Sequence, residues 1–123
     1  MAKHNETGKK GEEMALSYLL DKGWQIVATN WRYSRAEIDL IGKVQERLVF
    51  VEVKTRSGAL FGPPEVFVDY KKEQFIFEAA NAFMERKGYE GEIRFDIIAV
   101  YQQAKNHWKI THWEDAFFPG LQQ

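Results

Sequence analysis

The stretch from Leu48 to Arg56 (LVFVEVKTR) limits the fold more than any other part of the sequence. Its β-branched and aromatic residues are typical of a covered β-strand. Alternate side chains of a strand share one face, so Glu52 and Lys54 follow Phe50 on a face that begins apolar. Charged side chains are rare on a covered strand unless they are paired or bind a ligand. The stretch therefore predicts a buried strand whose end carries a charged cluster.

The preceding segment, residues 37–41 (EIDLI), predicts a second strand that is joined to the first by the polar turn 42–47. If this turn is centred directly after Gln45, Asp39 faces Glu52 across the hairpin. Directly opposed residues share a face with their Cβ atoms about 5 Å apart, so the two carboxylates repel each other. A divalent metal ion between them would remove that repulsion. The alternative is a solvated charge cluster at the rim of the sheet, without function.

Composition limits the class of protein. A chain of 123 residues predicts one domain spanning 1–123, with flexible ends at 1–6 and 119–123. A hydrophobic content of 45% and an aromatic content of 15% are typical of folded globular proteins. No apolar run approaches the ~20 residues of a membrane span, so we expect a cytoplasmic protein without a membrane partner. The absence of cysteine excludes disulfides, thiolate metal sites and cysteine nucleophiles.

The distribution of charge is more informative than the net charge of −1. Between Trp31 and Arg56 there are six basic and four acidic residues, and two of those acids are the candidate metal ligands. Between Glu65 and Asp96 the balance reverses, with eight acids against five bases. A polyanion would therefore prefer the side of the hairpin.

Two helices are predicted, over residues 7–22 and 68–87, and each ends before a glycine. Each also carries a charge in the middle of its apolar face: Glu12 in the first helix and Lys72 in the second. Glu12 is either an acid at a helix start that reaches solvent or a buried group held by a metal or a base. Lys72 either extends to solvent or points across the strand end toward a phosphate or a carboxylate.

Three further strands are predicted at residues 24–29, 93–101 and 108–113, and we expect the histidines to lie at a strand edge or on the surface. The order of elements is then α-β-β-β-α-β-β. The passage from the buried strand through the second helix to the fourth strand implies a parallel, right-handed crossover. The predicted fold class is α/β (α+β), with a central mixed five-stranded sheet flanked by helices.

Several short motifs occur in a fixed order along the chain: Gly11-Glu12, Asn30-Trp31-Arg32, Glu37-Ile38-Asp39-Leu40-Ile41, Phe50-Val51-Glu52-Val53-Lys54-Thr55-Arg56, Phe61-Gly62, Lys72 and Arg94-Phe95-Asp96. In this order they resemble the UPF0102 family, also called the YraN-like family, from about residue 8 to residue 118. Asp39 with Glu52-Val53-Lys54 is similar to the core of PD-(D/E)xK nucleases. The resemblance implies a restriction-endonuclease-like fold, closest in layout to archaeal Holliday junction resolvases.

The resemblance also implies roles for individual residues. The implied catalytic residues are Glu12, Asp39, Glu52 and Lys54. The implied ligands of Mg²⁺ or Mn²⁺ are Asp39, Glu52, the backbone carbonyl of Val53, and Glu12. Lys54 would orient or activate the attacking water, and Lys72 resembles the additional polar residue that this core carries on a helix. The chain departs from the family at Ala36, where glycine is common before Glu-Ile-Asp, and this puts in doubt a tight backbone contact there.

The leading hypothesis is a metal-dependent endonuclease that hydrolyses DNA phosphodiester bonds, with branched or damaged DNA as candidate substrates. The residues expected to hold neighbouring phosphates are Arg32, Arg35, Arg56 and Lys72. A homodimer with two-fold symmetry would be needed to cut two strands symmetrically. One alternative is a non-catalytic nucleic-acid-binding module with a nuclease-like fold. The other is a small interaction protein in which the charges are structural.

Overall fold

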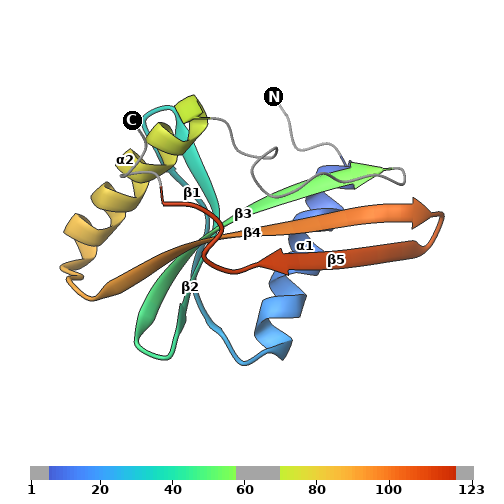
Figure 1. The fold of residues 1–123 in the computed structure, drawn as a ribbon, viewed down its shortest axis with the longest axis horizontal. Helices are drawn as coiled ribbons and strands as arrows, with labels where there is room; N and C mark the ends of the chain where they lie inside the picture. Colours follow the sequence, from blue (N-terminus) through green and yellow to red (C-terminus); the bar gives the residue numbers. More distant parts are fainter. Residues whose placement is uncertain (1–5, 58–69, 119–123) are drawn as a thin grey trace.

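The computed structural model describes residues 6–57 and 70–118, within which seven helices and strands follow one another (Figure 1). They are α1 (Glu6–Asp21), β1 (Gln25–Tyr33), β2 (Ala36–Val44), β3 (Arg47–Ser57), α2 (Tyr70–Lys87), β4 (Glu92–Ala104) and β5 (His107–Trp113). The predicted order α-β-β-β-α-β-β and the α+β class are confirmed. The expected start of the second helix at residue 68, and the motif Phe61-Gly62, lie outside the described residues.

The five strands form one sheet in the order β1-β2-β3-β4-β5. Only β3 and β4 are parallel, and α2 lies in the connection between them, so the predicted mixed sheet and crossover are confirmed. The register of the β2–β3 hairpin is also as predicted, because its pairs run from Leu40 with Val51 to Val44 with Arg47. Gln45 and Glu46 both have positive φ, 50° and 65°, as a two-residue type I′ turn requires.

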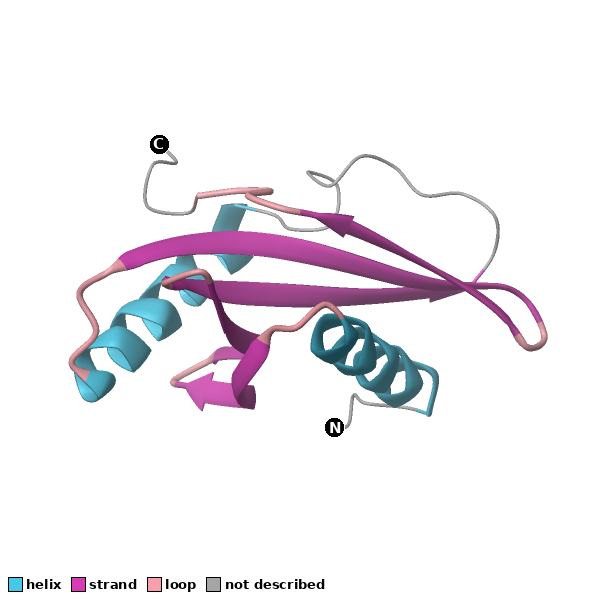
Figure 2. Ribbon diagram, turned by 90° about the horizontal axis from the view of Figure 1, so that it is seen from below, coloured by secondary structure: helices cyan, strands magenta, loops and turns pink. Residues whose placement is uncertain are grey.

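The two helices cover opposite faces of the central strands. Val49 and Val51 of β3 pack with Ala15 and Leu19 of α1, whereas Phe50 packs with α2. Figures 1 and 2 show the two helices over different parts of a strongly twisted sheet. Because β3 and β4 are covered on both faces, any charged side chain on them must be paired or placed at a strand end.

Both helices end in a Schellman motif, as their glycines predict. Gly23 and Gly88 have φ values of 90° and 65°, in the left-handed region that glycine tolerates. The N–H of Trp24 donates to the carbonyl of Leu19 at 3.1 Å. The corresponding bond at the end of α2 runs from the N–H of Tyr89 to the carbonyl of Met84 at 2.9 Å. These bonds turn the chain sharply into β1 and toward β4.

The start of α1 approaches β3 very closely at Gly11. A Cβ atom built on Gly11 would lie 3.0 Å from the Cβ of Thr55 and would overlap the rest of the threonine side chain. Glycine is therefore required for this approach. The contact brings Glu12, the next residue of α1, to the charged end of β3.

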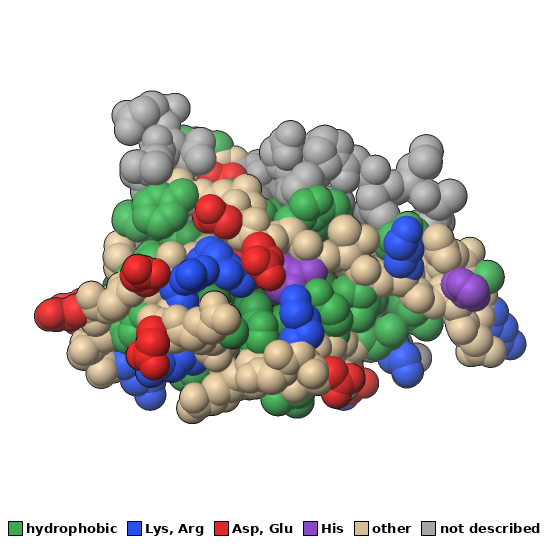
Figure 3. Space-filling view, turned by 60° about the horizontal axis from the view of Figure 1, so that its bottom comes forward, with side chains coloured by type: hydrophobic (Ala, Val, Ile, Leu, Met, Phe, Trp, Pro, Cys, Tyr) green, Lys and Arg blue, Asp and Glu red, His purple; other side chains and the backbone are tan. Residues whose placement is uncertain are grey.

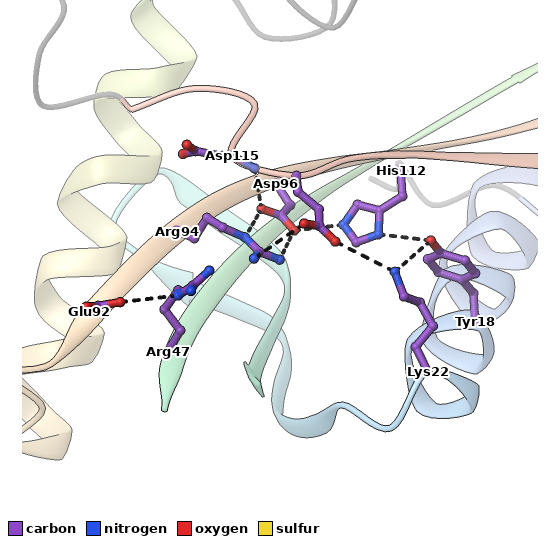
Figure 4. Close-up of polar contacts among 9 residues, drawn as sticks. Tyr18, Lys22, Arg47, Glu92, Arg94, Asp96, His112 and Asp115 are labelled. Carbon is purple, nitrogen blue, oxygen red and sulfur yellow. Dashed lines mark hydrogen bonds and ion pairs between the residues drawn. The ribbon is translucent and has the colours of Figure 1, made fainter. Parts of the chain in front are cut away.

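A polar cluster around Asp96 joins β4, β5 and the chain after β5 (Figure 4). Asp96 is fully buried, and its carboxylate accepts two hydrogen bonds from Arg94, at 2.8 and 2.9 Å. It also accepts one from Nε2 of His112 at 2.8 Å and one from the backbone N–H of Asp115 at 2.9 Å. Burial opposes the charge on Asp96, but the hydrogen bonds from His112 and Arg94 outweigh it and lower the pKa of Asp96.

His112 lies on β5, an edge strand of the sheet, as expected for the histidines, but its side chain is only 4% exposed. Its Nδ1 lies 3.1 Å from the hydroxyl of Tyr18 on α1, and Lys22 donates to that same hydroxyl at 3.3 Å. A carboxylate only accepts hydrogen bonds, so Nε2 of His112 carries a proton toward Asp96. The cluster therefore ties α1 to β4 and β5 through fully paired groups.

The outer surface agrees with the near-neutral net charge. On the face seen in Figure 3, acidic and basic side chains are intermixed, so this face presents no field of one sign to a polyanion. Within residues 6–57 and 70–118, no helix is both long and apolar enough to cross a bilayer.

Candidate functional site

A cleft of about 400 Å³ opens where the ends of α1, β2, β3 and α2 meet. All four predicted catalytic residues and most of the predicted phosphate-binding residues line it: Glu12, Arg35, Asp39, Glu52, Val53, Lys54, Arg56 and Lys72. They come from four different elements. The structure therefore brings together in one cleft the side chains that the sequence placed on a hairpin and on two helices.

Asp39 lies where β2 separates from β3. The backbone pairing of the two strands ends at Leu40 with Val51, and beyond that point the carboxylate of Asp39 accepts the N–H of Val53 at 2.7 Å. The side chain thus replaces the partner that β2 no longer offers to β3. In an extended strand the N–H and C=O of one residue point to the same side, so the carbonyl of Val53 faces the same gap.

Glu52 is 5% exposed and is held by two lysines. Lys72 reaches over from α2, and its Nζ lies 2.6 Å from Oε2 of Glu52. Lys54, two residues further along the same face of β3, places its Nζ 3.3 Å from the same oxygen. The position of Lys72 favours the interpretation in which it points across the strand end, because its ammonium is paired with a carboxylate there.

The cleft shifts the pKa values of its groups in opposite directions. Burial raises the pKa of Asp39 well above its usual range, and the charge of Glu52 raises it further, against the opposing hydrogen bond from Val53. Burial lowers the pKa of Lys54, and the neighbouring Lys72 adds to that effect although Glu52 opposes it. Burial, the largest single influence on Lys72, disfavours its charge, but the charge and hydrogen bond of Glu52, together with Lys54 and Asp39, outweigh burial and raise the pKa of Lys72.

Asn30 belongs to this region, although no role was predicted for it from the sequence beyond its place in the motif Asn30-Trp31-Arg32. Its side-chain amide donates to Oε1 of Glu12 at 3.2 Å and to Oε2 of Glu37 at 2.9 Å. Its φ of 49° lies in the left-handed region, which asparagine tolerates better than most residues. Asn30 therefore connects the α1 carboxylate to β2. An asparagine before Trp31 in a β-rich segment was the available sign of such a backbone position.

The predicted phosphate-binding residues divide into two groups. Arg35, Arg56 and Lys72 line the cleft, and Nη1 of Arg56 donates to the carbonyl of Thr55 at 2.9 Å. Arg32 lies in a neighbouring hollow, where its Nη2 is 3.3 Å from a carboxylate oxygen of Glu37. The structure therefore does not bring Arg32 into the cleft itself.

The donor set of the cleft fits a hard divalent cation. Asp39, Glu52 and Glu12 offer carboxylate oxygens and Val53 offers a carbonyl, which are the ligand types that Mg²⁺ and Mn²⁺ prefer. The raised pKa of Asp39 marks a buried carboxylate whose charge is not fully compensated. Within the described part of the chain, however, no three Asp, Glu or His side chains already stand in a metal-binding arrangement. At Glu52 the lysines supply the positive charge.

Known proteins are similar in sequence to this chain over nearly all of its residues. A family model described as "Uncharacterised protein family UPF0102" matches residues 11–100. The chain belongs to the UPF0102 family. UPF0102 protein FP2501 of Flavobacterium psychrophilum is 48% identical over 118 residues, which are 96% of this chain and 98% of that protein. A UPF0102 protein of Christiangramia forsetii is also 48% identical over 118 residues, with the same coverage.

A more distant organism has a similar relative. UPF0102 protein THEYE_A1950 of Thermodesulfovibrio yellowstonii is 42% identical over 113 residues, or 92% of this chain and 96% of that protein. The region that matches the UPF0102 model includes Glu12, Asp39, Glu52, Lys54 and Lys72. The candidate site of this UPF0102 protein therefore lies inside the part of the chain that defines the family.

Proposed function

We propose that this UPF0102 protein is a metal-dependent endonuclease that hydrolyses DNA phosphodiester bonds in the cleft. The observation that carries the proposal is the meeting of Asp39, Glu52 and Lys54 at the point where β2 leaves β3. Two carboxylates and an amine in that arrangement resemble the core of PD-(D/E)xK nucleases. Arginine and lysine side chains around the same cleft supply the positive charge that a phosphate backbone needs.

The residues of the cleft have separable roles in this proposal. Asp39, Glu52, Glu12 and the carbonyl of Val53 would hold the ion. When bound, Mg²⁺ or Mn²⁺ supplies a Lewis acid that neutralises charge on the phosphoryl oxygens and lowers the pKa of the attacking water. Lys54 orients that water and stabilises the negative charge that develops on the phosphate. Its lowered pKa makes Lys54 a readier proton donor than an exposed lysine.

The positively charged groups position the DNA. Arg35 and Arg56 hold phosphates on either side of the reacting one, without selecting a sequence. Lys72, which lies beside Glu52, would also contact a phosphate of the bound DNA. Cutting both strands of a branched substrate symmetrically would need a second copy of the chain.

A second candidate function is a non-catalytic nucleic-acid-binding module. One observation favours it: Lys72 and Lys54 neutralise Glu52 without any metal, at 2.6 and 3.3 Å. In that case the cleft would bind phosphates but would not accelerate hydrolysis. The two candidates differ in their response to divalent ions.

A cleavage screen tests the proposal. Purified protein is incubated with duplex, flap, single-stranded and four-way-junction DNA, in Mg²⁺, in Mn²⁺, and in EDTA. We expect metal-dependent cleavage of at least one substrate, and loss of it in EDTA and in Glu52→Ala. Cleavage that persists in EDTA or in Glu52→Ala would contradict the proposal. Salt-dependent DNA binding with no cleavage in either metal would establish the binding module instead.

Replacing Asn30 by glycine should weaken catalysis without disturbing the fold. Glycine keeps the left-handed backbone at this position but removes the amide that holds Glu12. Loss of a group that orients a metal ligand typically costs 10- to 100-fold in activity or metal affinity, so we expect roughly a tenfold lower cleavage rate. Initial rates across a Mn²⁺ titration measure it.

Asn106→Gly is the matched control for this variant. Asn106 also has positive φ, 69°, but it lies in the exposed turn between β4 and β5. That variant should cleave at the wild-type rate. Equal rates for Asn30→Gly and Asn106→Gly would show that Asn30 does not act through Glu12.

A further inference from the structure

Aromatic and arginine side chains form a strip over α2, the end of β1 and the turn that follows it. The strip consists of two groups: Trp31, Tyr33 and Arg86 in one, and Arg35 and Phe75 in the other. The rings of Trp31 and Tyr33 are stacked, with centroids 6.3 Å apart and planes 6° apart. The guanidinium of Arg86 lies 5.5 Å from both ring centroids. The guanidinium of Arg35 lies 5.2 Å from the centre of the Phe75 ring. In each of the two groups, a flat cation therefore lies against a flat ring.

The two arginines of the strip differ from the other arginines in their partners. Among the residues that the structure describes, no ion pair joins Arg35 or Arg86 to a carboxylate, and both guanidinium groups lie over aromatic rings. By contrast, Arg32 is paired with Glu37, and Arg94 with Asp96. An arginine on an aromatic face keeps its outward N–H donors for another acceptor. Within residues 6–57 and 70–118, the strip thus offers two positive charges that are not paired with an acid.

The strip is continuous with the cleft. Phe75 and Arg35 belong to the cleft lining itself, and Tyr33 pairs across the β1–β2 hairpin with Ala36, which also lines the cleft. From Phe75 to Arg86 the helix rises about 16 Å, at 1.5 Å per residue. A chain that leaves the cleft along this strip would pass over Tyr33, which is 36% exposed.

We propose that this strip binds unpaired nucleotides of a DNA strand that leaves the cleft. Bases stack on the exposed aromatic surface around Tyr33 and Phe75, and the intervening phosphates contact Arg35 and Arg86. Rows of aromatic rings and cations are the general means by which proteins hold single strands without reading sequence. In a duplex the bases are already stacked on each other and only phosphates are offered, so the rings select unpaired DNA.

The inference rests on the proposed function for its substrate, because it names which DNA the cleft would receive. It predicts that DNA with a single-stranded segment, such as a flap or a gap, binds more tightly than a fully paired duplex of equal length. The competing explanation is that the rings only cover the core and that the arginines only shield the rings. Binding without cleavage separates these two explanations and does not depend on catalysis.

The test measures binding of a fluorescent oligothymidylate and of a matched duplex by anisotropy in EDTA. For the single strand we expect Tyr33→Leu to raise the Kd between fivefold and a hundredfold, since stacking on one aromatic ring has that weight. Tyr33→Phe should stay within about twofold of wild type, because it keeps the ring. For the duplex, both variants should bind as the wild type does.

Charge is tested with a matched pair of substitutions. Arg86→Gln and Arg47→Gln each remove one positive charge, but Arg47 lies at the start of β3, where it pairs with the exposed Glu92. Only Arg86→Gln should weaken single-strand binding by more than threefold. Circular dichroism and thermal melting check that each variant is folded.

Three results would overturn the inference: tighter binding of duplex than of single strand, wild-type affinity in folded Tyr33→Leu, or equal losses in Arg86→Gln and Arg47→Gln. The results also distinguish an error in this inference from an error in the proposed nuclease function. If the strip is correct but the protein is no nuclease, oligothymidylate binds with the expected variant effects and is not cut in Mn²⁺. If only the strip is wrong, metal-dependent cleavage remains and Tyr33→Leu cleaves flap and duplex substrates as the wild type does.

Discussion

Asp39→Asn should abolish cleavage and at the same time make the metal-free protein more stable. Asparagine keeps an oxygen that can accept the N–H of Val53, which Asp39 accepts at 2.7 Å, so the local backbone is retained. It removes a buried negative charge that Glu52 and Glu12 repel. We expect cleavage to fall by at least ~10³-fold, as for loss of a principal group that stabilises the transition state. We expect the free energy of unfolding to rise by on the order of 1 kcal/mol.

The difference in free energy of unfolding between Asp39→Asn and the wild type should change with pH in one predictable direction. The pKa of Asp39 is raised in the folded protein, so the folded state binds a proton more tightly than the unfolded state does. The wild type therefore loses stability as pH rises from the ordinary aspartate pKa through the raised one, and above it the penalty is complete. The additional stability of Asp39→Asn should therefore be absent in acid, increase as pH rises between the two pKa values, and then stay constant.

Urea unfolding in EDTA at a series of pH values measures this difference, and the same experiment with Mn²⁺ tests the metal site. Mn²⁺ should stabilise the wild type and leave Asp39→Asn unchanged. Glu92→Gln, which neutralises an exposed acid far from the cleft, should show neither effect. A destabilised Asp39→Asn in EDTA, or equal stabilisation of both proteins by Mn²⁺, would speak against a cation site between the carboxylates.

Asp96→Ala should have the largest effect on stability, a loss of about 3–5 kcal/mol, because it leaves buried donors without their acceptor. The groups left behind are the guanidinium of Arg94, Nε2 of His112 and the backbone N–H of Asp115. Such a loss approaches the whole stability of many small domains. Asp96→Asn keeps the shape and one acceptor, so it should fold with a smaller loss and can be compared directly in urea.

The pKa of Asp96 gives this effect a pH dependence opposite to that of Asp39. Its folded pKa is lowered, so its contribution is present above the ordinary aspartate pKa and is lost as pH falls through the lowered one. The difference in free energy of unfolding between the wild type and Asp96→Asn should therefore become smaller in acid. Glu92→Gln, in the exposed pair with Arg47, should cost less than ~1 kcal/mol at any pH. A difference between the wild type and Asp96→Asn that became larger in acid would contradict this explanation.

The sequence predicted the β2–β3 hairpin well because residues close together in the chain determine its register. Alternation in the stretch from Leu48 to Arg56 defined the two faces of β3, and a short polar turn left few registers for β2. Asp39 and Glu52 followed directly from that register. Glu12 and Lys72 were found because a charge on an apolar helix face conflicts with its surroundings, and such conflicts are common at functional sites.

The remaining features depend on contacts between distant parts of the chain. His112 bonds Tyr18 across 94 positions, and no local pattern around either residue indicates that they meet. Asn30 reaches Glu12 and Glu37 only because β1 has a left-handed residue beside the cleft. The partner of Arg32 likewise depends on the β1–β2 register, which sets it opposite Glu37. These positions are determined by how the sheet twists and how α1 packs on it.

If the cleft binds both an ion and DNA as proposed, the contact of Lys72 with Glu52 would make the two binding events depend on each other. An ion that uses Oε2 of Glu52 must displace Lys72 from its contact at 2.6 Å, and the released ammonium then needs a new anion. A DNA phosphate provides one, and a phosphate that attracts Lys72 in turn exposes Glu52 to the ion. The two ligands then share a coupling free energy, and thermodynamic reciprocity requires each to strengthen the other by the same factor. Under the proposed function, Glu52 would therefore stay paired with Lys72 until the ion and the DNA are both present.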